Sequence, residues 1–164
     1  MGFDESITYI PTVLESPHVA VGAAIATKIP NPLIAIPLAI GSHFILDRIP
    51  HWNPHSYTET QKNGRVSKNT IVFALTDVAV SLAIGFYIAS RALPDYRHAA
   101  VILAASFFAV LPDLAKSPYF LLNQRKGLIK KYVDFERSLQ VETKFAVGMT
   151  VQLLVIAASF WWIS

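Results

Sequence analysis

Long apolar segments separated by short polar connections dominate this chain. Residues 70–92 form an apolar run in which Asp77 is the first charged side chain, and a run of about 20 residues is long enough to cross a bilayer as a helix. Residues 145–163 form a second run of this kind, with Trp161 and Trp162 near its end, as in the aromatic belts at membrane interfaces. Both runs are predicted to be transmembrane helices.

Shorter apolar segments precede each of these long runs or lie between them. Ser16 and Pro17 match an N-cap and the first position of a helix that continues to Thr27. The sequence KIPNP predicts a turn, after which residues 33–47 form a second apolar helix, and residues 98–112 form another that ends in Leu-Pro-Asp. The hairpin formed by the first two short helices is expected to be tilted, partly re-entrant or sheltered by its neighbours.

These segments predict one all-α domain over residues 1–164, a polytopic membrane bundle of about five helices built on two repeated helical hairpins. Its expected parts are hairpin one at 17–49, hairpin two at 70–115, an interfacial segment at 116–144 and the last helix at 145–163.

The two hairpins resemble each other in sequence. HVAVGAAIA, which starts at His18, aligns with DVAVSLAIG, which starts at Asp77. AIGSHFILD, which ends at Asp47, aligns more weakly with ASFFAVLPD, which ends at Asp113. If every apolar helix crosses the membrane, the start of the first helix and the end of the second lie on the same side in both copies. The repeat therefore predicts that these four side chains converge.

Composition supports a membrane protein and restricts the chemistry. Hydrophobic residues make up 53% of the chain and charged residues 15%, and the net charge is +3 without a basic stripe, so nucleic-acid binding is not expected. There are no cysteines, so any metal must be bound by nitrogen and oxygen. Most bases lie on the predicted site side, against Lys28, Arg91 and Arg97 on the other, which predicts a bacterial or archaeal cytoplasmic membrane with the site facing the cytoplasm.

Candidate metal ligands recur at four-residue spacing. His43 and Asp47 share one helix face, and His51 follows Pro50, where the helix should end and turn back. Histidine and carboxylate donors with space for water suit Zn first, with Mn or Fe as alternatives, and one or two ions. The predicted metal ligands are His18, His43, Asp47, His51, Asp77 and Asp113, with Asp47 and Asp113 as the catalytic pair and Arg48 and Lys116 as substrate-binding cations.

Simpler interpretations compete with these roles. Asp77 can be protonated or bonded to neighbouring hydroxyls, and bases near an interface commonly extend toward water without binding anything. His55 is expected in a solvated loop and His98 on the opposite side. Glu142 is expected to favour the dipole of the last helix, and Gln152 to bond across helices.

The motifs resemble a known family. An early His (His18), an Asp-x-x-Pro-His (Asp47 to His51) and a Leu-Pro-Asp closing a membrane helix (Asp113) resemble the small bacterial inner-membrane metal-dependent hydrolases of the LexA-regulated, YdjM-like type. The resemblance implies a membrane metallohydrolase with His18 and Asp113 at its metal site. The chain departs from that family where Leu-Ala-Lys-Ser-Pro replaces Ile-Asp-His-Pro after Asp113, and it lacks a His-Arg-x-x-x-Thr-His-Ser stretch.

Three functions follow from these features. The first is a membrane-embedded metal-dependent hydrolase, of phosphatase or esterase type, acting on a lipid-like ester or phosphoester. The second is a small proton- or ion-coupled transporter that uses intramembrane Asp and His. The third is a membrane partner protein in which a metal only joins short helices. Membrane lipids are the expected partners, and assembly into a homo-oligomer stays open.

Overall fold

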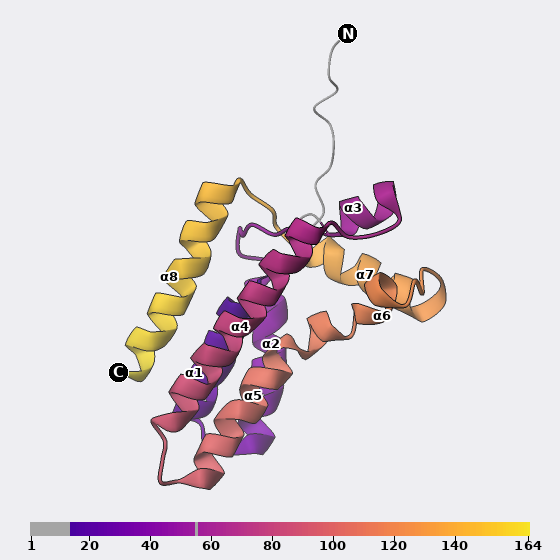
Figure 1. Cartoon of the computed structure of the whole chain (residues 1–164). Coiled ribbons are helices and arrows are strands. Elements are labelled where there is room, and N and C mark those ends of the chain that lie inside the picture. Colours follow the sequence, from indigo (N-terminus) through magenta and orange to yellow (C-terminus); the bar gives the residue numbers. More distant parts are fainter. Residues whose placement is uncertain (1–13, 55) are drawn as a thin grey trace.

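The chain forms a bundle of α-helices. In the computed structural model, which describes residues 14–54 and 56–164, there are eight α-helices and no β-strand (Figure 1). The predicted all-α class is therefore confirmed, whereas His55 lies outside the described residues. The helices are α1 (Glu15–Lys28), α2 (Pro32–Leu46), α3 (Ser56–Asn63), α4 (Lys68–Ser90), α5 (Tyr96–Leu114), α6 (Ser117–Leu121), α7 (Gly127–Leu139) and α8 (Phe145–Ile163).

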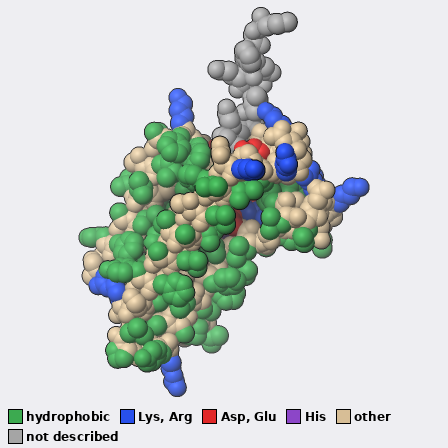
Figure 2. Space-filling model, viewed as in Figure 1, with side chains coloured by type: hydrophobic (Ala, Val, Ile, Leu, Met, Phe, Trp, Pro, Cys, Tyr) green, Lys and Arg blue, Asp and Glu red, His purple; other side chains and the backbone are tan. Residues whose placement is uncertain are grey.

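Three helices, α4, α5 and α8, are long and apolar enough to cross a membrane, while α2 is apolar but shorter. Their outer faces carry large exposed apolar side chains, for example Leu75 and Leu82 on α4 and Leu153 on α8. On the face shown in Figure 2, hydrophobic side chains are spread over the length of the bundle, and positive ones gather mainly at the end that carries α3, α6 and α7. This distribution is that of a protein with a lipid-facing body and a polar end.

Helix α1 is the centre of the bundle. It contacts α2, α4, α5 and α8, and it is buried on nearly all sides although it has only 14 residues. Residues 19–26 of this helix are all Ala, Gly, Val or Ile, so this stretch has no polar face to turn toward solvent and packs among the other helices. The sheltered first helix predicted from its length is thus what the structure contains.

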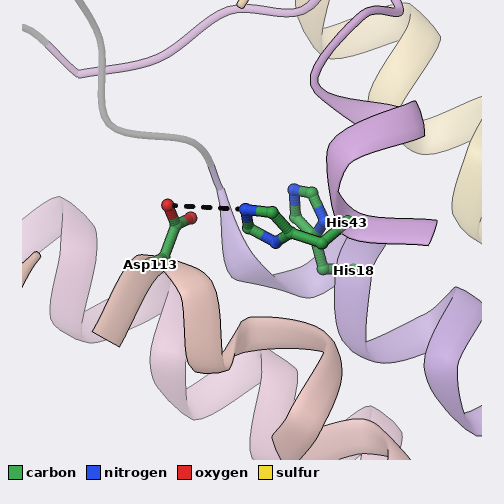
Figure 3. Close-up of side chains that lie close together, drawn as sticks. All are labelled: His18, His43 and Asp113. Atoms are coloured by element: carbon green, nitrogen blue, oxygen red, sulfur yellow. Dashed lines mark ion pairs between the residues drawn. The ribbon is translucent and has the colours of Figure 1, made fainter. Parts of the chain in front are cut away.

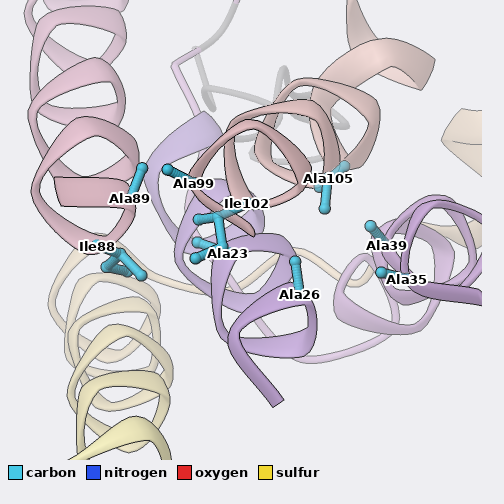
Figure 4. Packing of buried hydrophobic residues seen from close by; sticks show 10 residues of the cluster. Ala23, Ala26, Ala35, Ala39, Ile88, Ala89, Ala99, Ile102 and Ala105 are labelled. Carbon is cyan, nitrogen blue, oxygen red and sulfur yellow. The ribbon is translucent and has the colours of Figure 1, made fainter. Parts of the chain in front are cut away.

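Small side chains let the helices of the core approach closely. Ala23 and Ala26 of α1 pack with Ala105 of α5 and with Ala35 and Ala39 of α2 (Figure 4). Close approach of small residues is the usual way in which membrane helices gain dispersion energy, because lipid offers no hydrophobic driving force for their association. These contacts pack the second half of α1 against the first half of α2 and the middle of α5.

The start of α1 differs from the prediction. The helix begins at Glu15, its N-cap position is Leu14, and no side chain caps it. Ser16 is not the N-cap, because its hydroxyl donates to Asp77 Oδ1 at 2.6 Å. The last helix begins at Phe145, as predicted.

The predicted interfacial segment 116–144 contains two helices, α6 and α7. After α7 the chain runs beside the segment that follows α2, where His51 N–H donates to the Val141 carbonyl at 3.1 Å and Thr143 N–H donates to the His51 carbonyl at 3.0 Å. Glu142 lies in this pairing and not in the first turn of α8, so its predicted dipole role is wrong. The pairing holds α7 over the open end of the bundle.

Candidate metal centre

Two histidines and one aspartate from the first two helices meet at the polar end of the bundle. His18 Nε2 lies 3.7 Å from Asp47 Oδ1, and His43 Nε2 lies 3.6 Å from Asp47 Oδ2. The two imidazole rings lie side by side, with centroids 4.3 Å apart. All three side chains are buried, with exposed fractions of 0–1%. One turn of helix separates His43 and Asp47, which is why both reach the same point.

Helix α5 adds a second carboxylate. His43 Nε2 lies 3.8 Å from Asp113 Oδ1 (Figure 3). One ligand atom from each of His18, His43 and Asp113 lies within 4.8 Å of the others. Two ligands at about 2.0–2.1 Å from one tetrahedral ion lie about 3.4 Å apart, so small side-chain rotations suffice for one ion to contact all three.

Hydrogen bonding fixes which nitrogen of His43 faces the cluster. Its Nδ1 lies 2.9 Å from the Ala109 carbonyl oxygen, which can only accept, so Nδ1 carries the proton. In the neutral ring, Nε2 then carries a lone pair. This lone pair faces carboxylate oxygens at distances too long for hydrogen bonds. His43 Nε2 and both oxygens of Asp47 are buried and form no hydrogen bond of normal geometry. Facing acceptors of this kind need a proton or a metal ion between them, and the donor set fits a metal ion.

The negative charge of this region exceeds its positive charge. Five carboxylates that interact with one another lie in or beside the cluster. Among the described residues, Lys116 is the ammonium group that contacts them, so the net charge is −4 when all six groups are ionised. Such an excess in a buried site requires protons or a bound cation. The five are Glu15, Asp47, Asp77, Asp113 and Glu136.

Lys116 joins two of these carboxylates. Its ammonium contacts Asp113 and lies 2.6 Å from Glu136 Oε2. Burial alone lowers the pKa of Lys116, but the two carboxylates more than offset this, so its pKa lies above the ordinary value and the side chain stays charged. Burial raises the pKa of Glu136, and Lys116 opposes that rise.

Glu136 is a site residue that sequence reasoning missed. Its Oε1 lies 3.9 Å from His43 Nε2 and accepts a hydrogen bond of 2.6 Å from the hydroxyl of Tyr132. A signal was present, because Ile129, Val133 and Glu136 recur at helical spacing on the inward face of α7, and a carboxylate on a buried face is unusual. Glu15, which lies one helical turn before His18, was missed too. Its carboxyl group interacts with that of Asp113.

His51 lies on the other side of His18. Its Nδ1 lies 2.7 Å from the Ile49 carbonyl oxygen, and its Nε2 is buried without a partner. Burial lowers the pKa of His51 and so favours the neutral, metal-binding form. His51 and His18 line a cavity of about 20 Å³, which is enough for one water molecule.

Asp77 is held differently from the other predicted ligands. Its carboxylate accepts hydrogen bonds from Ser16 Oγ at 2.6 Å and from the Glu15 N–H at 2.5 Å. Both oxygens are thus used at the start of α1, as in the simpler interpretation. Asp77 therefore positions the start of α1. Glu15, one of its two donors, lies three residues before His18.

The remaining predicted residues fall outside the cluster or have other partners. Arg48 is exposed, whereas Lys116 is buried among carboxylates. His98 Nε2 lies 3.0 Å from the Ala26 carbonyl at the other end of the bundle. Gln152 Nε2 donates to the Trp52 carbonyl at 3.1 Å. Trp52 lies in the connection between α2 and α3, so the bond expected across helices instead joins α8 to this connection.

A groove of about 1340 Å³ leads to the cluster. Glu15, Asp77, Asp113 and Lys116 line its inner end, and α4 supplies an apolar wall. The groove gives a small molecule access to these carboxylates along the apolar wall that α4 supplies.

The comparisons with known proteins add no second source of evidence. The sequence matches no known protein-family profile, no curated protein and no solved structure. Inference about the activity therefore depends on the residues of this cluster and on the groove beside it.

Proposed function

We propose that this chain is a membrane-embedded metal-dependent hydrolase that acts on a lipid-like ester or phosphoester at the cytoplasmic face of the membrane. The observation that carries the proposal is the buried His43 Nε2, which faces oxygens of Asp47, Asp113 and Glu136 at 3.6–3.9 Å with no hydrogen bond to satisfy it. The short motifs shared with the YdjM-like hydrolases, at His18, Asp47 and Asp113, agree with this proposal.

The donors fit zinc best among the common ions. Two imidazoles and carboxylates are the ligands of catalytic Zn sites, and Mn or Fe would accept the same set. His18, His43 and Asp113 would hold the first ion, and Asp47 would share it or contribute to a second. When bound, a divalent ion supplies Lewis acidity and a water activated for attack at neutral pH.

The protein residues would orient these donors. The Ala109 carbonyl sets the tautomer of His43, and Lys116 and Tyr132 hold Asp113 and Glu136 in place. Partners of this kind typically change metal affinity or activity about 10- to 100-fold. Their presence here argues for a site built to bind an ion in one arrangement.

The transporter alternative has less support. The buried ionisable side chains gather at one end of the described bundle, and the interior beyond them is packed with alanine and isoleucine, as at Ala23, Ala105 and Ile102. A continuous polar path through the described helices would be needed for coupled transport. We also propose that α1, α2, α4, α5 and α8 all lie in the membrane as two repeated hairpins and a last helix.

Elemental analysis of the detergent-solubilised protein tests the proposal. We expect about one or two equivalents of Zn, Mn or Fe per chain, lost in Asp113→Asn and His43→Gln and retained in the control Asp95→Asn at the opposite end. Hydrolysis of phosphoester and ester probes should disappear with the metal and return when it is added back. Equal metal content in all four proteins, or none in any, would refute the metal site; bound metal without hydrolysis in a broad screen would favour a structural ion.

A further inference from the structure

The groove beside the candidate centre combines three chemical environments along its length. At its inner end lie Glu15 and Asp113. One wall is the α4 face that carries Ile71, Leu75 and Val78, which are 47%, 63% and 43% exposed. This face continues the apolar surface of the bundle, so the groove opens toward the acyl region of the bilayer.

The rim of the groove at the polar end is basic. Arg65 comes from the connection between α3 and α4, Lys68 is the first residue of α4, and Arg125 comes from the connection between α6 and α7. Arg125 Nη2 donates to the Gly64 carbonyl at 3.0 Å, which ties the two connections together beside Arg65. Gly64 has φ +72°, a conformation that glycine adopts without strain, and it turns the chain from α3 toward this rim.

We infer that the groove binds an anionic phospholipid, with its phosphate at Arg65, Lys68 and Arg125 and an acyl chain along α4. The inference rests on the proposed function for the reaction itself and adds the substrate class to it. Charge complementarity favours an anionic headgroup, since the rim carries three bases and the inner carboxylates would repel an anion placed deeper. The apolar wall favours a lipid over a soluble phosphate, because a soluble ion would leave that wall unused.

The chain provides a matched control for the rim. Lys28, Arg91 and Arg97 are three exposed bases at the opposite end of the bundle, and they will attract anionic lipid only as any interfacial base does. A triple Gln variant at the rim and a triple Gln variant at the opposite end therefore have the same change in charge. A difference in lipid binding between the two variants therefore reports binding in the groove.

Native mass spectrometry of the delipidated protein, titrated with phosphatidylglycerol or phosphatidylcholine of identical chains, measures the preference. With about a fivefold contribution from each base near a lipid phosphate, the wild type and the opposite-end triple should prefer phosphatidylglycerol by at least about tenfold. The rim triple should bind both lipids alike. Equal preference in all three proteins would overturn the inference.

Two further measurements identify the ligand and separate the two proposals. Leu75→Trp fills the groove and should lower phosphatidylglycerol binding, whereas Leu82→Trp, on the same helix and 56% exposed, should not; equal effects would refute an acyl chain on this wall. Complete displacement by inorganic phosphate would also refute it. Metal content should be unchanged in the rim triple, so lost metal binding in Asp113→Asn and lost lipid preference in the rim triple are distinguishable failures.

Discussion

Replacing Gly22 with alanine would put a β-carbon 2.7 Å from Ala109 Cβ and 2.8 Å from the Ala105 carbonyl oxygen. Carbon atoms normally pack about 3.5–4.0 Å apart, so the new methyl group is about 1 Å too close to α5. Neither neighbour has a rotatable side chain that can move away. Helices α1 and α5 must therefore separate, and overpacking of this kind typically costs about 1–3 kcal/mol.

Two other glycines in the predicted hairpins provide graded controls. At Gly85 the nearest atom to a β-carbon is Val19 Cγ1 at 3.5 Å, an ordinary contact, and at Gly41 nothing lies within 4 Å. All three substitutions gain similar helix propensity, about 0.5–1 kcal/mol in water. The difference between Gly22→Ala and Gly41→Ala thus isolates the overpacking, about 1–3 kcal/mol, and Gly85→Ala should resemble Gly41→Ala.

Unfolding in mixed detergent and dodecyl sulfate micelles, followed by circular dichroism, measures these differences. Metal content should fall in Gly22→Ala as well, because His18 lies one helical turn before the position that must move. If Gly22→Ala is as stable as Gly41→Ala, then α1 does not pack against α5 as described and the geometry of the centre loses its support.

Three shorter predictions test the surroundings of the site. Tyr132→Phe should weaken metal affinity about 10- to 100-fold by chelator competition, and the exposed control Asp134→Asn on the same helix should not. Gln152→Leu should lower the free energy of unfolding by about 0.6–1.7 kcal/mol, measured by dodecyl sulfate titration, because the Trp52 carbonyl loses its donor. Lys62→Cys, a single thiol in a cysteine-free chain, should react with an impermeant maleimide only after cells are opened; labelling of intact cells would contradict a cytoplasmic site.

Much of the helical framework followed from apolar patterning alone. The last helix was predicted to its first and last residue, and the long helix α4 to within two residues at each end. Patterning was reliable here because membrane helices must be apolar over their full length. It was less informative for residues 116–144, where α7 has mixed charge and its buried face became evident only once α7 lay over the bundle.

The site was predicted in part for the same reason. Counting the expected membrane crossings predicts which helix ends lie on the same side of the bundle. This count was enough to bring together His18, His43, Asp47 and Asp113. Glu136 was not predicted, since its position depends on the backbone pairing of residues 141–143 with His51, for which the sequence has no periodic signal. Arg48 points to solvent for a local reason, because it follows the last turn of α2 on the exposed face.

Residues that the predicted repeat pairs with each other make different contacts in the structure. Asp47 and Asp113 end the second helix of each hairpin and both reach the same histidines. His18 lies in the first turn of α1, whereas Asp77 lies well inside α4 and accepts hydrogen bonds from the Glu15 N–H and the Ser16 hydroxyl instead of facing His43. His43 Nε2 already faces oxygens of three carboxylates, Asp47, Asp113 and Glu136, so a fourth carboxylate at the same point would add repulsion. Asp77 lies outside this cluster and fixes the start of the helix that carries His18, so the two predicted hairpins contribute different residues to the cluster and its surroundings.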